Sequence, residues 1–292
     1  MPSKRFEISL KRIEENEILG GKERADELRQ KGETLSVTNR PTEPYQLPLW
    51  ETEKRALPHP MTRSALFTPV ARGKRKVSRN LELIASRPDT KILFSGEQLD
   101  IGDQDVFYQV IELAKQKGMG EFIRFNRAEF LRAIGRAAGK ATYEWLHRSL
   151  DRLNFAQIKV ETKRCLCAFH LIDKIIWETQ TDDFILKVDN DVRSLFDEHQ
   201  YGLIDWQKRK QIHGGKKDLA KFIQSYANSH KRGEEHKIKL HDLMVLAGRS
   251  LDSRLDMFRA DVKIALVELK RLEIISETGR VTENDIVCFI PI

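Results

Sequence analysis

Apolar residues recur every three or four positions in some stretches of this chain and every second position in others. The stretch 91–96 alternates as a strand does. The stretch 103–118 has the helical period, and it predicts a helix capped by Asp103 and ended by Gly118.

The same two periods continue along the next segment. A strand is expected at 121–125, followed by a helix that begins at Asn126, with Glu129 completing a capping box. The helix 140–153 has an apolar stripe, and two alternating strands follow it, with Thr162, Lys163 and Arg164 at the bend between them.

This order of elements then recurs. It comprises an expected helix at 216–230, a strand at 236–240, a short helix ending at Gly248, a long helix at 249–272, and a hairpin turning near Gly279. The segment 123–136 also resembles 238–249, at an offset of about 115 residues, which indicates a duplicated module.

The order helix, strand, helix, turn, helix and hairpin is that of a winged helix, a helix-turn-helix with a β-hairpin wing. The expected fold is therefore α+β, with two tandem winged-helix domains. We expect a largely disordered arm at 1–60, rich in charge and proline, a first domain at 61–198 and a second at 199–292.

Tandem winged helices predict a DNA-binding protein in which 139–153 and 252–271 are recognition helices. The outer faces of these helices and the expected wing tips carry polar and basic residues that can reach phosphates and base edges. The candidates are Lys140, Glu144 and Arg148 on the first helix, Arg249, Ser250, Ser253, Arg254, Met257 and Lys263 on the second, Lys163 and Arg164 at the first wing tip, and Arg280 at the second. Alternatively these are solvated surfaces, with Glu144 and Arg148 forming an ordinary ion pair.

The charge of the chain favours the first interpretation. Lysine and arginine number 51 against 44 aspartate and glutamate residues, a net charge of +7, and five of the eight residues at 72–79 are basic. We expect Lys74, Arg75 and Lys76 to lie in a linker without fixed geometry and to contact phosphates of any sequence.

Enzymatic motifs are missing from the sequence. The Gly-Lys pair at 213–218 lacks the upstream glycine and the Ser/Thr of a nucleotide-binding loop, and no His-x-His pair occurs for a nicking enzyme. Cys165, Cys167 and His170 lack a fourth zinc ligand. We therefore expect no catalytic residues, no metal and no cofactor. Three cysteines and the absence of a long apolar run fit a cytoplasmic protein that neither spans nor binds a membrane.

One short segment of the expected arm is unusually apolar. Gln46-Leu-Pro-Leu-Trp50 places Leu47, Leu49 and Trp50 in a polar, proline-rich tract, so that either the protein itself or a partner must cover them. The segment resembles the Gln-Leu-x-Leu-Phe peptide with which bacterial replication proteins bind the DNA polymerase III sliding clamp, with Trp50 in place of the usual phenylalanine.

The peptide, the Arg-Ser-Ala-Leu-Phe segment at 63–67 and the two modules together resemble the TrfA-type plasmid replication initiators, from Gln46 to the end of the chain. The resemblance implies binding to repeated origin sites (iterons) in double-stranded DNA, opening of an adjacent A·T-rich stretch, and recruitment of the sliding clamp, host helicase and host initiator proteins. It also implies a monomer–dimer equilibrium in which monomers bind iterons. The alternatives are a transcriptional regulator of the same fold and a structural or partition adaptor.

Overall fold

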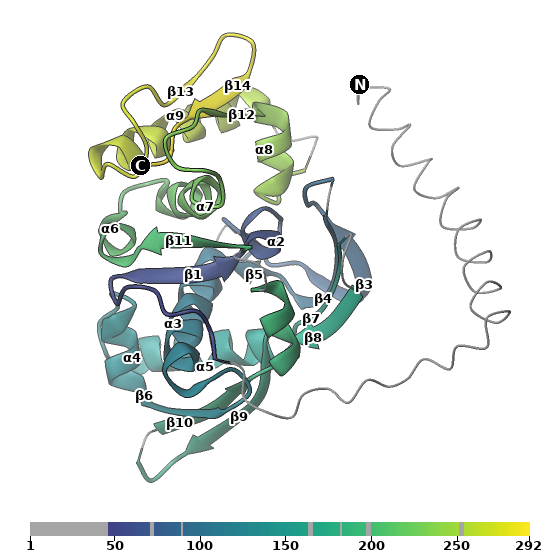
Figure 1. Cartoon of the computed structure of the whole chain (residues 1–292), viewed down its shortest axis with the longest axis vertical. Coiled ribbons are helices and arrows are strands. Elements are labelled where there is room, and N and C mark those ends of the chain that lie inside the picture. Colours follow the sequence, from purple (N-terminus) through teal and green to yellow (C-terminus); the bar gives the residue numbers. More distant parts are fainter. Residues whose placement is uncertain are drawn as a thin grey trace, which may run out of the picture. The chain divides into compact units, whose positions relative to one another are not determined.

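The computed structural model describes residues 46–70, 73–88, 90–162, 166–181, 183–196, 200–250 and 254–292 (Figure 1). All of them belong to one compact unit of the chain, Pro44–Ile292.

The C-terminal repeat is a winged helix. Its strands form an antiparallel sheet in the order β12-β14-β13, so that the hairpin after the last helix pairs with the strand after the first. Its elements are α7 (Lys217–Ala227), β12 (His236–Lys239), α8 (Leu240–Leu246), α9 (Leu255–Arg271), β13 (Arg280–Val281) and β14 (Ile286–Phe289).

The N-terminal repeat has the same topology, with the sheet order β6-β10-β9. The structure therefore confirms the expected α+β fold and the duplication. Its elements are α3 (Ile101–Lys117), β6 (Phe122–Asn126), α4 (Arg127–Ala133), α5 (Lys140–Phe155), β9 (Ile172–Glu178) and β10 (Asp183–Val188).

The wing of the first module is not the hairpin that the sequence indicates. The expected hairpin, β7 (Gln157–Thr162) and β8 (Leu166–His170), joins β3 (Val77–Ile84) and β4 (Thr90–Glu97) in a separate antiparallel sheet of order β3-β4-β7-β8. Pairing with β6 instead makes β9 and β10 the wing. The sequence favours strands in both the β7–β8 hairpin and the β9–β10 hairpin. Only the pairing with β6 shows that the β9–β10 hairpin is the wing.

The arm expected at 1–60 is folded from residue 46 onward, and its residues 1–45 lie outside the described residues. Strand β1 (Lys54–Pro58) pairs antiparallel with β11 (Tyr201–Asp205), and Leu47 and Leu57 are buried in the core. Residues 46–60 are thus part of the folded unit. The remaining elements are α2 (His59–Thr62), β2 (Phe67–Thr68), β5 (Leu99–Asp100), which pairs parallel with β2, the 3-10 helix η1 (Asn190–Leu195) and α6 (Trp206–Gln211).

Two local expectations need correction. Helix α3 begins three residues early, because Asp100 is its N-cap and Asp103, at the third helical position, completes the capping box. The second wing turns between Thr282 and Asp285 rather than at Gly279, so Arg280 lies within β13, opposite Cys288. The N-cap expected at Asn126 and the helix end expected at Gly118 are confirmed, while the reciprocal bond from the Glu129 side chain stays a prediction.

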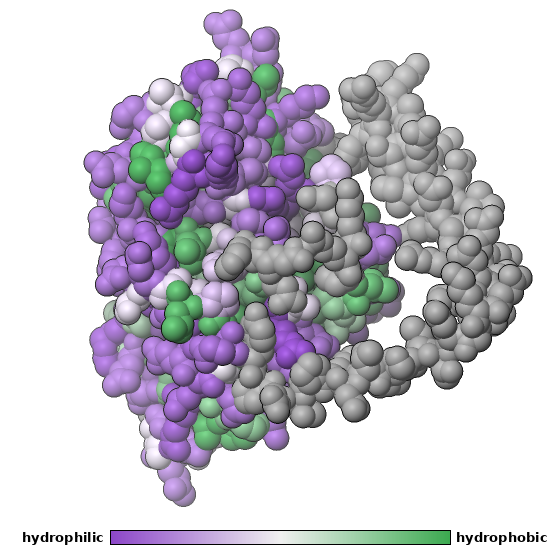
Figure 2. Space-filling view, in the orientation of Figure 1, coloured by the Kyte–Doolittle hydropathy of each residue, from purple (hydrophilic) through white to green (hydrophobic). Residues whose placement is uncertain are grey.

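The described residues form two hydrophobic cores. The first gathers buried residues from Leu47 to Trp206, and the second gathers Ile101 with residues from Ile212 to Phe289. The strand β11 and Trp206, which we expected in the second domain, therefore pack with the first. The face shown in Figure 2 is mainly hydrophilic, with hydrophobic residues in separate patches.

Candidate nucleic-acid interface

Helix α5 presents a polar face to solvent. Leu146, Leu150 and Leu153 are buried on the opposite side, which fixes the rotation of the helix. Lys140, Glu144 and Arg148 are consequently exposed, as the sequence predicts. Glycine at the N-cap leaves the first backbone N–H groups of α5 without a side-chain acceptor, a polarity that suits a phosphate.

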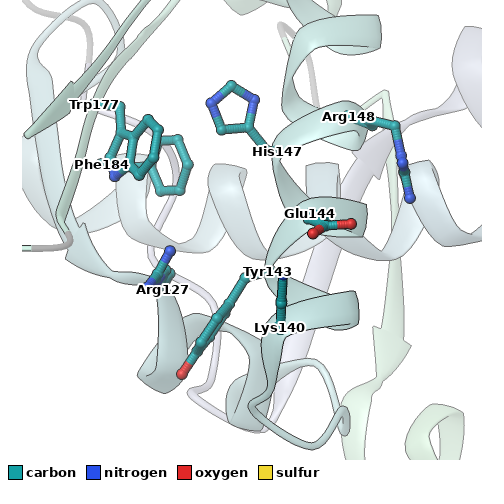
Figure 3. A pocket seen from close by; sticks show the side chains of 8 residues that line it. All are labelled: Arg127, Lys140, Tyr143, Glu144, His147, Arg148, Trp177 and Phe184. Atoms are coloured by element: carbon teal, nitrogen blue, oxygen red, sulfur yellow. The ribbon is translucent and has the colours of Figure 1, made fainter. Parts of the chain in front are cut away.

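A groove of about 670 Å³ lies between α5 and the wing (Figure 3). The guanidinium of Arg127 stands 3.9 Å from the ring centroid of Tyr143, and the edge of His147 faces Trp177 at 5.3 Å between centroids. Trp177 is 43% exposed, so its ring is accessible from the groove. In nucleic-acid interfaces, cationic side chains contact phosphates and accessible aromatic rings stack on bases, and this groove offers both.

Sequence reasoning missed most of this groove. Lys140, Glu144 and Arg148 were predicted, whereas Arg127, Tyr143, His147, Trp177 and Phe184 were not. Trp177 was detectable in principle, since it ends a short apolar run, Ile175–Trp177, that lies between Lys174 and Glu178 and needs a covering partner. Its position beside α5 depends on β9 being the wing.

Helix α9 carries the corresponding face of the second module. Arg254 is the N-cap residue and pairs with Asp256 at 2.6 Å, an exposed contact that raises the pKa of Arg254 and lowers that of Asp256. Arg249 pairs with Asp261 at 3.4 Å. An exposed pair such as Arg254–Asp256 is weak in water, and its arginine can exchange the acidic partner for a phosphate.

The remaining predicted residues of this module are distributed around α9 and the wing. Met257 is 57% exposed and Lys263 is also exposed, while Ser250 lies just before the helix. Arg280 lies in β13, 3.6 Å from Glu235. Ser253, Lys163 and Arg164 lie outside the described residues, and the bend that holds the last two joins β7 to β8 rather than forming the wing.

The basic segment before β3 is only partly a free linker. Arg75 pairs with Asp100 and, at 2.9 Å, with the fully buried Asp103, and the Arg75 side chain is 19% exposed. Our expectation that this residue has no fixed geometry is therefore wrong. Lys74 and Lys76 are more accessible to solvent than Arg75. Burial, then the neighbouring Asp103, raises the pKa of Asp100 to about 6.

The apolar pentapeptide packs largely on its own protein. The amide of Gln46 donates to the carbonyl of Lys115 at 2.7 Å, and the indole Nε1 of Trp50 donates to Glu112 at 2.8 Å. Lys115 donates in turn to the carbonyl of Trp50 at 3.1 Å. Leu47 is buried and Trp50 is 9% exposed, but Leu49 is 83% exposed. We call the surface of α3 that holds the peptide, formed by Glu112 and Lys115, the seat.

The described residues offer neither a metal-binding cluster nor a membrane span. No group of three or more His, Cys, Asp or Glu residues in this part of the chain is arranged to hold a metal ion. Among the same residues, no helix has the length and apolar character needed to cross a membrane. Cys288 is buried and Cys167 is half-buried, and Cys165 lies outside the described residues.

Comparison with known proteins identifies the family. The family model described as TrfA protein matches residues 33–289. This protein belongs to the TrfA family. Within that family, the plasmid replication initiator protein TrfA of Escherichia coli is 27% identical over 238 residues, an alignment that covers 77% of this chain and 59% of that protein. The chain thus matches 59% of the length of this curated relative.

Solved structures share the fold of this TrfA-family chain at low sequence identity. The Pi initiator protein in complex with iteron DNA is 13% identical, with a TM-score of 0.54, covering 84% of this chain and 99% of Pi. Domains 2 and 3 of RctB are likewise 13% identical, with a TM-score of 0.53, covering 80% of this chain and 98% of that chain. These likenesses support the tandem winged-helix fold.

Proposed function

We propose that this protein initiates plasmid replication by binding repeated duplex sites in an origin through both winged-helix modules. The observation that carries the proposal is the presence, in a TrfA-family chain, of two recognition helices that each leave a face exposed to solvent, with Lys140 and Arg148 on α5 and Arg254 and Lys263 on α9. The Pi initiator, which has the same fold, was solved in complex with iteron DNA. The E. coli relative is named as a plasmid replication initiator.

In this proposal α5 and α9 each enter a major groove of one site. Lys140 and Arg148 on α5, and Arg249 and Arg254 at the start of α9, contact phosphates or base edges. The groove beside α5 follows the DNA backbone, with Arg127 supplying charge. Because the protein carries no nucleotide-binding loop motif, opening of an adjacent A·T-rich stretch draws on binding energy, supercoiling and host proteins.

The proposal includes recruitment of the sliding clamp through Gln46–Trp50, together with host helicase and initiator proteins. Of the three apolar anchors, Leu49 is exposed while Leu47 and Trp50 are buried. Capture by a hydrophobic pocket on the clamp therefore requires Leu47 and Trp50 to leave the seat, so the fold and the clamp compete for the same two side chains. This competition lowers the apparent affinity for the clamp by the fraction of molecules whose peptide is docked.

Footprinting of the purified full chain on its own plasmid tests the DNA-binding proposal. We expect protection of direct repeats in the origin and a loss of about tenfold or more in affinity for Arg148→Ala and for Arg254→Ala. Arg124→Ala is the matched control, because the Arg124 side chain is about half-exposed on the edge strand β6 and lies on neither recognition helix. Protection confined to a promoter would assign the protein to transcriptional regulation instead.

A further inference from the structure

Helix α9 has an apolar stripe on the side that faces away from its own core. Met257 is 57% exposed, Ile264 53% and Val267 61%, and Ala260 between them is also exposed. At 3.6 residues per turn these four lie within about 80° of one another around the helix axis, on the side opposite the buried row that includes Phe258, Val262 and Leu266. A solvated helix normally carries polar residues at this position.

The charges around this stripe indicate what covers it. Lys263 lies on the same outward side, and Arg249 and Arg254 lie at the start of the helix. The negative charge of Asp256, the acidic residue in the first turn, is balanced by its ion pair with Arg254. An apolar protein surface would have to desolvate the lysine and arginines, whereas a DNA groove supplies phosphates on both sides of the helix.

The major groove also contains an apolar group of the right kind. Thymine projects its C5-methyl group there, and small apolar side chains recognise it by contact. Met257 and Ile264 are separated by about 10 Å along the helix axis. That distance corresponds to about three base pairs. Ala260 between them lets the helix backbone approach closely.

We propose that Met257, Ala260 and Ile264 read thymine methyl groups in the major groove, so that the second module discriminates A·T from G·C pairs by apolar contact. This inference rests on the proposed DNA binding and names specificity residues for it. Val267, one turn further toward the C-terminus, contributes less, because the N-terminal end of a recognition helix lies deepest in the groove.

Replacing thymine by deoxyuridine tests this contact, because it removes the methyl group and leaves every hydrogen-bonding group in place. The probe is a duplex that the full wild-type chain selects from a randomised library. Single deoxyuridine substitutions in it should weaken wild-type binding by about three- to fivefold at two or three neighbouring positions. Met257→Gln and Ile264→Gln should each bind less tightly and become insensitive to deoxyuridine at one of those positions.

Leu166→Gln provides the matched control, since Leu166 is 63% exposed on β8, away from α9. It should keep both the affinity and the deoxyuridine sensitivity of the wild type. The inference fails if the wild type binds its selected site but ignores every deoxyuridine substitution, or if the α9 variants stay as sensitive as the wild type. It also fails if Met257→Gln changes the sedimentation of the free protein while DNA affinity is unchanged. Failure of the wild type to select any sequence would instead overturn the proposed function.

Discussion

Arg209 donates from Nε to Oδ1 of Asp105 across 2.6 Å, joining α6 to α3, and neither residue is more than 4% exposed. Lys221 of α7 binds the other carboxylate oxygen, also at 2.6 Å, and Arg209 reaches Gln104 and Gln224 as well. Burial alone would raise the pKa of Asp105, but the charges of Arg209 and Lys221 outweigh it and hold that pKa below its ordinary value. This network links the two modules through buried polar groups.

Arg209→Met should therefore destabilise the protein severely. Removing one partner leaves Asp105 buried with only Lys221 to compensate it, which costs about 3–5 kcal/mol in comparable buried pairs. Urea denaturation measures the difference in unfolding free energy. Arg124→Met is the control, because Arg124 is half-exposed and its pairs with Glu178 and Asp183 lie at the surface. Equal losses in the two variants would contradict the role given to burial.

Two histidines should make the second module sensitive to acid. His230 and His236 lie with 3.6 Å between ring centroids and their planes tilted by 35°, near Arg63 and Arg87, and His236 also contacts the hydroxyl of Tyr226. Burial, then the neighbouring cationic groups, lowers the pKa of His230 to about 3 and that of His236 to about 4.

The sign of the pH effect follows from these values. Below pH 6.5, the ordinary pKa of histidine, these two side chains bind protons in the unfolded chain but stay neutral in the folded protein. The free energy of unfolding therefore falls as the pH drops from about 6.5 toward 4. The loss is at most about 1.4 kcal/mol per pH unit for each histidine, and less because both rings are partly exposed. His236→Gln should flatten this dependence in urea titrations at pH 7 and pH 5. An unchanged slope would assign the acid sensitivity to other groups.

Leu49 and Trp50 should respond differently to truncation. Leu49→Ala should weaken clamp binding and leave the melting temperature unchanged, because Leu49 is 83% exposed. Trp50→Ala should cost about 3–5 kcal/mol of stability through the lost packing and the lost hydrogen bond to Glu112. Calorimetry and a pull-down with purified clamp separate the two effects. A lower melting temperature for Leu49→Ala would show that the peptide packs more completely than this structure indicates.

Glu112→Gln should increase clamp binding. The substitution keeps the shape of the seat but removes the negative charge of the Glu112 carboxylate. That carboxylate lies 2.8 Å from the Lys115 ammonium and accepts the hydrogen bond from the Trp50 indole. A weaker seat raises the fraction of molecules with a free peptide, and we expect a several-fold gain in affinity for the clamp. Adding Leu49→Ala to Glu112→Gln should abolish the gain. If Glu112→Gln left clamp affinity unchanged, docking would not compete with clamp binding.

The residues of the basic segment should serve two different functions, DNA binding by Lys74 and Lys76 and stabilisation of the fold by Arg75. Lys74→Ala combined with Lys76→Ala should weaken binding to specific and scrambled DNA alike, and should reduce the slope of log K against log salt by about 0.9 for each phosphate that the variant no longer neutralises. Arg75→Ala should instead lower the stability of the fold, because it leaves the buried Asp103 with Arg152 as its remaining ion-pair partner among the described residues. Binding across a salt series and urea denaturation of each variant distinguish these effects. Equal stability of the Arg75 variant and the lysine double variant would contradict the assignment.

The amino-acid sequence by itself determined where the helices lie, some of their ends and the duplication. Asn126 caps α4 and Gly118 ends α3 because these effects act between residues a few positions apart. The exposed faces of α5 and α9 followed from the same local period, and Lys140, Arg148 and Met257 are exposed as predicted.

Tertiary structure decided what pairs with what. The pairing of β10 with β6, rather than the alternation of β7 and β8, identifies the first wing and so places Trp177 beside α5. The docking of Trp50 on Glu112 and the pairing of Arg75 with Asp103 likewise join residues far apart in the chain. A periodic pattern shows that a side chain needs a partner but not which partner covers it, because hydrophobic burial is non-directional and charges pair wherever the fold brings them together.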